Sequence, residues 1–187
     1  METERRMRLG TPQAPTWSLF ERLFPAGSGG IRVALDWDRL RELQRMGTLQ
    51  ITREEAVVTG LPPRRHFYAP WYADRSGRPT DYRSPEARPL RSSDLALDAD
   101  RMSDRQRQRV RFFESAMAGP DPCRRAALLR IPTLDLGHSR SLVLDGNHRL
   151  VAVLRLAADG RRPARIAEFR LTVPLDEKLL PDLRHWS

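Results

Sequence analysis

The sequence is short of lysine, cysteine and long apolar runs. Lys178 is the only lysine, so the other basic residues are arginine, and Cys123 is the only cysteine. A single cysteine excludes an internal disulfide and a metal site built from several cysteines. No apolar run approaches the ~20 residues that a bilayer requires. The first residues, 1–6, lack the apolar core of a signal peptide. We therefore expect a cytoplasmic protein without a membrane partner.

The charge is strongly basic, with a net value of +9 over 187 residues. Nucleic acid is the first partner that such a charge suggests. The arginines, however, alternate with acidic residues instead of forming long runs. The alternating arginines of residues 105–111 are interpreted as the solvated face of a helix. Nucleic acid is therefore an open but unfavoured partner, and the oligomeric state is left open.

Residues 1–87 are expected to form a mostly helical and irregular extension. Apolar residues at 17–24 predict one or two turns that dock on a core, and Asp36 begins a helix that ends at Gly47. The capping-box pattern Thr52-Arg-Glu-Glu55 predicts a short helix to about Val58. Residues 61–91 are expected to be irregular. Their aromatic and basic stretch, 64–72, is interpreted as a surface arm in preference to a base-stacking platform.

Residues 88–187 are expected to form a separate α+β domain, a small mixed sheet with flanking helices. Helices are predicted at 102–117, 123–129 and 147–158 from their apolar spacing. Strands are predicted at 133–136, 141–144 and 166–173, and residues 90–97 as an extended segment. The tail from Pro174 is expected to lie on the surface.

The most informative segment is 142–154, in which a short apolar strand turns at Asp145-Gly146 into an apolar helix. The first N–H groups of a helix lack partners and attract anions. Gly146 lets the backbone approach a phosphate, and Arg149 supplies paired donors for its oxygens. The segment therefore predicts a binding site for a phosphorylated ligand.

Three further residues of the turn have alternative roles. His148 is expected to donate to a phosphate or to stabilise charge during transfer, and otherwise to bond a neighbouring backbone group. Asp145 is expected to hold Mg²⁺ together with phosphates, or else to cap the helix. Asn147 is a second candidate for that cap.

The segment 143–150 resembles the nucleotide-phosphate motif of the ParB/sulfiredoxin superfamily. It is most similar to the Asp-Gly-His-His-Arg form of ParB-like free-serine kinases. The segment 88–102 also resembles the sulfiredoxin entry segment, in which an acidic residue precedes a basic, phosphate-binding one. Asp100 and Arg101 match that pair. The resemblance covers about residues 88–174 and implies a nucleotide-binding fold of this type.

Departures from the family narrow what the resemblance implies. Asn147 stands where sulfiredoxins have their nucleophilic cysteine, so sulfiredoxin-type reduction has no nucleophile. No helix-turn-helix pattern follows the motif, which argues against partitioning-type DNA clamping. No glutamate matches the one implicated in the serine kinases. This leaves Asp98, Asp100 and Asp94 as the groups expected near an acceptor hydroxyl.

We therefore expect a phosphotransferase that uses ATP or another nucleotide, with Mg²⁺, to phosphorylate a small hydroxyl-bearing molecule. The predicted catalytic residues are His148, Asp100 and Asp98, and the predicted nucleotide-binding residues are 145–149 and Arg101. Two alternatives stay open. One is a non-catalytic nucleotide-binding module with a protein or DNA partner, and the other is a metal-dependent nuclease or nucleotide hydrolase.

Overall fold

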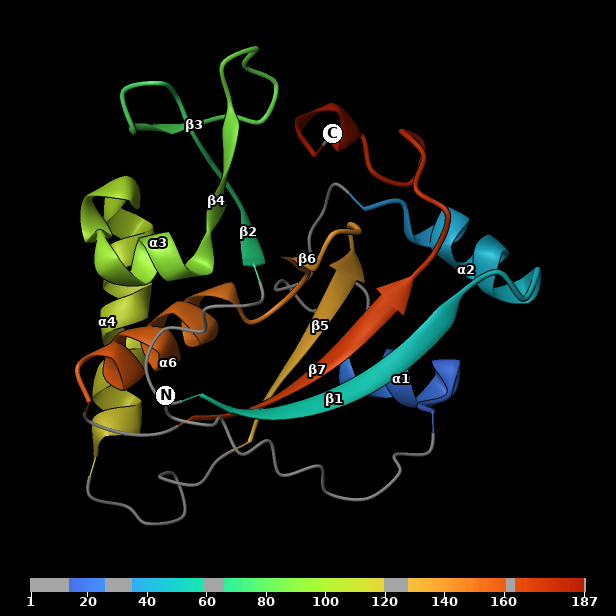
Figure 1. Ribbon diagram of the computed structural model, residues 1–187, viewed down its shortest axis with the longest axis horizontal. Helices are drawn as coiled ribbons and strands as arrows, with labels where there is room; N and C mark the ends of the chain where they lie inside the picture. Colours follow the sequence, from blue (N-terminus) through green and yellow to red (C-terminus); the bar gives the residue numbers. More distant parts are fainter. Residues whose placement is uncertain (1–13, 26–34, 59–65, 120–127, 161–163, 187) are drawn as a thin grey trace, which may run out of the picture.

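The chain folds into a mixed β-sheet with helices on both faces (Figure 1). The computed structural model describes residues 14–25, 35–58, 66–119, 128–160 and 164–186. The predicted α+β class is confirmed. None of the helices in these ranges is long and apolar enough to cross a membrane.

The sheet within the described residues has seven strands in the order β1-β7-β5-β6-β2-β3, with β4 paired to β2. Their bounds are β1 Gln50–Val58, β2 His66–Ala73, β3 Pro79–Thr80, β4 Arg88–Arg91, β5 Leu129–Asp135, β6 Arg140–Val143 and β7 Ala164–Thr172. The β5–β7 and β2–β6 pairs are parallel, whereas β1–β7 and β5–β6 are antiparallel.

The helices are α1 Trp17–Leu23, α2 Trp37–Arg45, α3 Ser92–Leu97, α4 Asp104–Ala118 and α6 Asn147–Ala158, with 3₁₀ turns η1 Ala99–Arg101 and η2 Leu183–His185. Local capping explains several of their starts. The carboxylate of Asp36 accepts from the Arg39 N–H at 2.8 Å at the start of α2, and Ser103 and Gln106 form a capping box at the start of α4. The predictions for α2, α4 and α6 are confirmed.

The helix predicted from Thr52 to Val58 is wrong, because these residues lie in β1. β1 pairs with β7 over its whole length, from Gln50↔Thr172 to Val58↔Ala164. A capping-box pattern is a local signal, whereas this ladder joins segments more than 100 residues apart. Cross-strand pairing overrides such local preferences.

Other expectations for the first half also change. The stretch expected as a surface arm contains β2, which pairs with β6, so the sheet continues across the predicted boundary at residues 87 and 88. Residues 90–97 do not form one extended segment, because α3 begins at Ser92. The predicted helix at 123–129 falls mostly outside the described residues.

The tail does not lie on the surface as expected. Leu179 and Leu180 are fully buried, Trp186 is nearly so, and the buried Asp182 accepts a hydrogen bond from the Tyr72 hydroxyl. The backbone N–H of Asp36 donates to the Leu179 carbonyl at 3.1 Å, which joins the tail to the start of α2.

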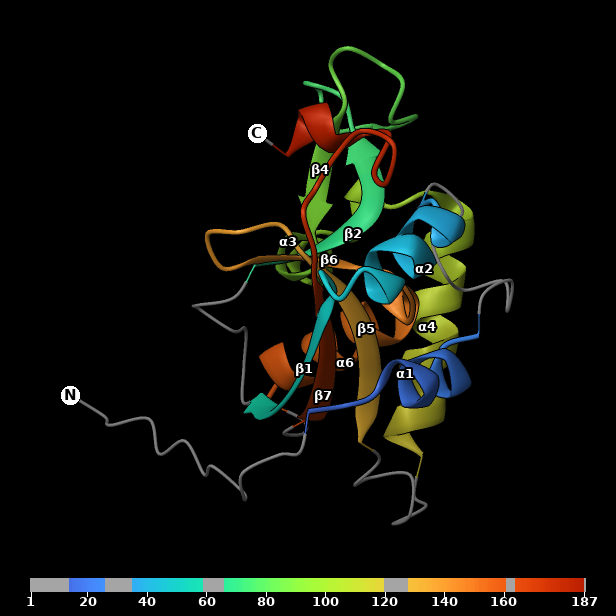
Figure 2. The same cartoon turned by 90° about the vertical axis from the view of Figure 1, so that its right-hand side faces the viewer.

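The two faces of the sheet have separate apolar cores. One core includes Phe20, Leu40, Leu134 and Phe169 and lies under α1 and α2, which occupy the same side of the sheet in Figure 2. The other lies between the sheet and α6, and includes Ile131 and Leu154. α6 is buried on most of its surface because α3 and α4 cover its outer side.

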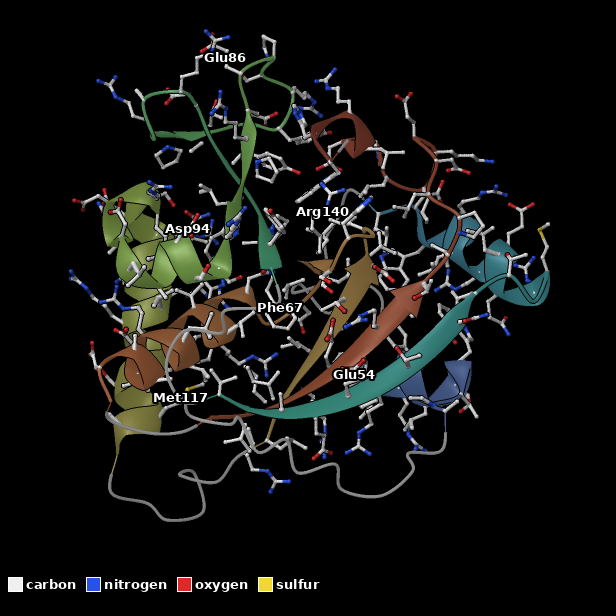
Figure 3. The ribbon with its side chains drawn as sticks, in the orientation of Figure 1. Glu54, Phe67, Glu86, Asp94, Met117 and Arg140 are labelled. Carbon is white, nitrogen blue, oxygen red and sulfur yellow. The ribbon has the colours of Figure 1, made fainter. Side chains whose placement is uncertain are left out.

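Polar residues occupy the rest of the face on which α6 lies. The carboxylate of Glu168, 3% exposed, accepts hydrogen bonds from the hydroxyls of Thr133 at 2.7 Å and Ser141 at 3.0 Å. Arg170 forms an ion pair with it at 2.9 Å, and Figure 3 shows Glu54 on the neighbouring strand β1. These partners together compensate the buried charge of the Glu168 carboxylate. We therefore interpret the network as one that stabilises the fold.

Phe20 tests the packing of α1. It is fully buried, stacks on Trp17 at 5.5 Å between ring centroids and contacts Phe24 at 5.2 Å. Phe20→Ala is expected to lower the free energy of unfolding by about 3–5 kcal/mol, because it leaves a cavity in the core. Urea denaturation measures the change. Leu97→Ala, at a position 69% exposed, is the control and is expected to change it by at most about 0.5 kcal/mol. Equal losses in the two variants would contradict the packing of α1 on the sheet.

Candidate functional site

The predicted strand–turn–helix is present, and its turn leaves the N-terminus of α6 open. The Leu150 N–H donates to the Gly146 carbonyl at 2.8 Å, which closes the first turn of the helix. Among the described residues, no side chain caps this helix. The turn therefore presents unpaired N–H groups with the positive end of the helix dipole, which is the arrangement that binds anions.

Glycine is required at position 146 for two reasons. Its φ of 81° lies in the left-handed region, which side chains disfavour. A Cβ atom there would also lie 3.3 Å from Nη2 of Arg149 and 3.5 Å from Cγ2 of Ile131. The missing side chain thus gives the Arg149 guanidinium its place over the turn.

Asp145 and Arg149 form one edge of the turn. One carboxylate oxygen of Asp145 accepts from the Gly146 N–H at 2.6 Å, and the other lies 3.5 Å from Nη2 of Arg149. The Arg149 side chain is 39% exposed. The carboxylate therefore orients the guanidinium and leaves it accessible to a ligand.

The Asn147 side chain ties the turn to the preceding strand. Asn147 is 6% exposed, and its Nδ2 donates to the Val143 carbonyl at 3.2 Å. This contact differs from the capping role considered for Asn147. The group that this residue can offer a ligand is its backbone N–H at the start of α6.

His148 lies against an aromatic residue that the sequence did not place at the turn. Its ring is 4.8 Å from the ring of Trp71 on β2. Burial lowers the pKa of His148, and the positive charges of Arg109 and Arg105 lower it further, while Asp145 opposes the shift. His148 is therefore mainly neutral at pH 7.

Arg105 and Arg109 come near His148 because α4 packs along α6. Val110 shares a core with Val151 and Ala152, and Glu114 pairs with Arg155. The contacting residues occur in the same order along α4 and along α6. The first turns of the two helices therefore lie at the same end of the packed pair. From the sequence, these arginines were interpreted as a solvated helix face. That interpretation did not place them near His148, because their position depends on the packing of α4 against α6.

The positions of Arg105 and Arg109 are electrostatically costly. They are spaced i,i+4 on α4, a spacing at which like charges repel, and Arg105 lies in the first helical turn, where a cation meets the positive dipole end. No carboxylate among the described residues forms an ion pair with either of them. A bound anion would relieve both effects.

The acids proposed as catalytic groups lie elsewhere. Asp98 pairs with Arg101 at 3.1 Å, and Asp100, whose side chain is 96% exposed, lies 3.5 Å from Arg107. The first contact lies within η1 and its cap, and the second joins η1 to α4. No hydrogen bond or ion pair between described residues joins η1 to the turn. Asp94 lies on α3 (Figure 3). Among the described residues, no hydrogen bond or ion pair therefore links Asp94, Asp98, Asp100 or Arg101 to residues 145–149.

Arg140 also lies away from the turn. It begins β6, whereas the turn follows the other end of that strand (Figure 3). Its guanidinium donates to the carbonyls of Leu136 and Gly137, each at 3.5 Å. Arg140 therefore closes the preceding hairpin.

A cavity of about 220 Å³ adjoins the other side of the turn. It is lined by four apolar residues, Leu23, Phe24, Leu128 and Leu129, and by three charged residues, Arg130, Asp145 and Arg149. The turn at residues 145–149 therefore has arginines of α4 near His148 and this cavity beside Asp145 and Arg149. The N-terminal residues 23 and 24 were not predicted to approach the site.

A magnesium ion would fit this site only in one mode. The described residues contain no group of three or more His, Cys, Asp or Glu side chains that could enclose a metal ion. Mg²⁺ commonly binds through one or two carboxylates together with substrate phosphates. The single carboxylate of Asp145 suits that mode.

The lowered pKa of His148 predicts how stability depends on pH. In the unfolded chain, His148 has a pKa near 6.5 and binds a proton below that pH. In the folded chain its pKa is lower, so it stays neutral over part of that range. The wild type is therefore expected to lose stability as the pH falls from 6.5 to the lower folded pKa. His148→Asn should remove that loss, and urea unfolding of both proteins at several pH values measures it. A wild type that gains stability relative to the variant over this window would contradict the assignment.

Comparisons with known proteins identify no relative. No family model matches the chain, and neither the curated proteins nor the solved structures include a match.

Proposed function

We propose that this chain is a nucleotide-dependent phosphotransferase whose turn at residues 145–149 binds the phosphates of a nucleoside triphosphate. One observation carries the proposal. The uncapped N-terminus of α6 carries Arg149 in its first turn and has Arg105 and Arg109 of α4 near enough to act on His148, and neither of these two forms an ion pair with a described residue. Guanidinium groups around a helix N-terminus suit the oxygens of phosphate as well as those of carboxylates and sulfate.

The number of positive groups favours a polyphosphate over a single phosphate. Three guanidinium groups and the helix dipole face the site, and Asp145 is the one acid that acts on His148. If Arg149 binds the terminal phosphate, Arg105 and Arg109 are available to bind the other phosphates of the nucleotide. Phosphoryl transfer needs such charge neutralisation more than it needs covalent chemistry from the protein.

The remaining site residues have roles consistent with this chemistry. Neutral His148 can donate one hydrogen bond to a phosphate oxygen, and protonated His148 would add a positive charge. Asp145 would hold Mg²⁺ when the ion arrives with the nucleotide, and the ion would polarise the phosphate being transferred. The strand–turn–helix at residues 140–158 supports the proposed relation to the ParB/sulfiredoxin superfamily, whose motif requires this arrangement.

A non-catalytic nucleotide-binding module is the second candidate, and the position of Asp98 and Asp100 favours it. Both acids are engaged in η1 contacts away from the turn, so the phosphate site lacks the base expected of a kinase. A metal-dependent nuclease has less support, because no acidic cluster occurs in the described residues.

Arg149→Ala is expected to weaken ATP binding by about ten- to hundredfold, because hydrogen bonds to charged groups contribute about 1.5–3 kcal/mol each. Isothermal titration with ATP and Mg²⁺ measures the affinity. Arg111→Ala removes the same charge from an exposed position of α4 and serves as the control, with an expected change below about twofold. An unchanged ATP affinity in Arg149→Ala would refute the proposal.

Transfer is tested separately from binding. The wild type is incubated with ATP, Mg²⁺ and a panel of small alcohols and hydroxy acids, and ADP is measured. We expect ADP release that depends on an acceptor and is lost in Arg149→Ala. Binding of ATP without acceptor-dependent ADP release would instead establish the binding module.

A further inference from the structure

The cavity beside the turn is built partly by the N-terminal segment. Phe24, at the end of α1, is 4% exposed and packs edge-on against Phe169 of β7 at 5.4 Å between ring centroids. With Leu23 it forms one side of the cavity, and Leu128 and Leu129 form another. The fully buried Phe20 holds α1 in this position. The apolar part of the lining is therefore a consequence of how α1 packs on the sheet.

The size of the cavity limits its ligand. Its volume of about 220 Å³ is smaller than the roughly 300–1,000 Å³ typical of pockets for drug-sized ligands. It is suited to a molecule of a few carbon atoms more than to a whole nucleoside. The phosphate chain and nucleoside have an alternative place on the α4 side of the turn, near Arg105, Arg109 and Trp71.

The charged residues in its lining indicate an anionic ligand. Among the described residues, the lining includes two cations, Arg130 and Arg149, and one acid, Asp145. Since the proposed function assigns Arg149 to the terminal phosphate, Arg130 is left to neutralise a charge on the ligand of this cavity. The carboxylate of Asp145 can accept a hydrogen bond from a hydroxyl group.

We propose that this cavity is the acceptor site and takes a small hydroxy acid. The apolar chain of the acid lies against residues 23, 24, 128 and 129, its carboxylate faces Arg130, and its hydroxyl faces Asp145. This inference rests on the proposed function. The hydroxyl oxygen bonds to the terminal phosphorus as the bond from that phosphorus to the bridging oxygen breaks. The hydroxyl proton passes to water, and the products are a phosphate monoester and a nucleoside diphosphate.

The test uses 3-hydroxybutyrate as the probe and 1,3-butanediol as its uncharged match. Each is titrated into the full chain labelled at leucine methyl groups, and NMR shifts are followed at Leu23 and Leu129. We expect saturable shifts with 3-hydroxybutyrate and at least about fivefold weaker binding of the diol, because the diol lacks the charge that Arg130 pairs with.

Two variants locate the binding. Leu128→Trp fills the cavity and is expected to abolish the saturable shifts, whereas Leu97→Trp, at an exposed position, retains them. Arg130→Gln is expected to weaken 3-hydroxybutyrate by about fivefold while leaving the diol unchanged, since it removes one charge–charge contact at an exposed site. Arg111→Gln is its charge-matched control.

The outcomes separate this inference from the proposed function. Saturable binding of 3-hydroxybutyrate that responds to both variants supports it. ATP binding by the wild type with no response at Leu23 or Leu129 overturns the acceptor site alone. A loss of ATP affinity in Leu128→Trp as large as its loss of 3-hydroxybutyrate binding also overturns it, because the nucleotide would then occupy the cavity. No ATP binding by the wild type refutes the proposed function itself.

Discussion

The burial of α6 is the constraint on which the rest of the structure depends. Eight of its twelve residues are buried, because the sheet covers one side of the helix and α3 and α4 cover the other. A helix enclosed in this way cannot shift without opening both cores. Its first turn is therefore held in place by packing, in addition to the polar contacts of Asp145 and Asn147 at the turn.

The same packing concentrates positive charge. Arginines on α4 and α6 that are distant in sequence meet around the N-terminus of a helix, where cations are unfavourable in the absence of an anion. Burial lowers the pKa of His148 most, and the charges of Arg109 and Arg105 lower it further. Repulsion between these positive charges lowers the stability of the ligand-free protein. Binding of an anion would reduce that repulsion.

Sequence reasoning succeeded where the signal was local. Asp36, the Ser103–Gln106 capping box and Gly146 each act within one turn, and the helices that they begin were predicted correctly. It failed at Thr52–Val58, where pairing with β7 overrides a helical pattern. It also failed at Trp71, Arg105 and Leu23, whose places at the site depend on contacts between distant segments. Nothing in the spacing of these residues marks them as neighbours of the turn.

The sequence by itself determined the turn and its chemistry. An apolar strand, Asp145-Gly146 and an apolar helix specify an open helix N-terminus with Arg149 above it, because each of these effects operates over a few residues. Only the tertiary structure decided what surrounds that turn. The packing of α4 on α6 and of α1 on the sheet places arginines and a cavity beside the turn, and Asp98 and Asp100 form their ion pairs with other residues. Such placements depend on the burial of apolar surface across the whole fold, which short-range patterns do not encode.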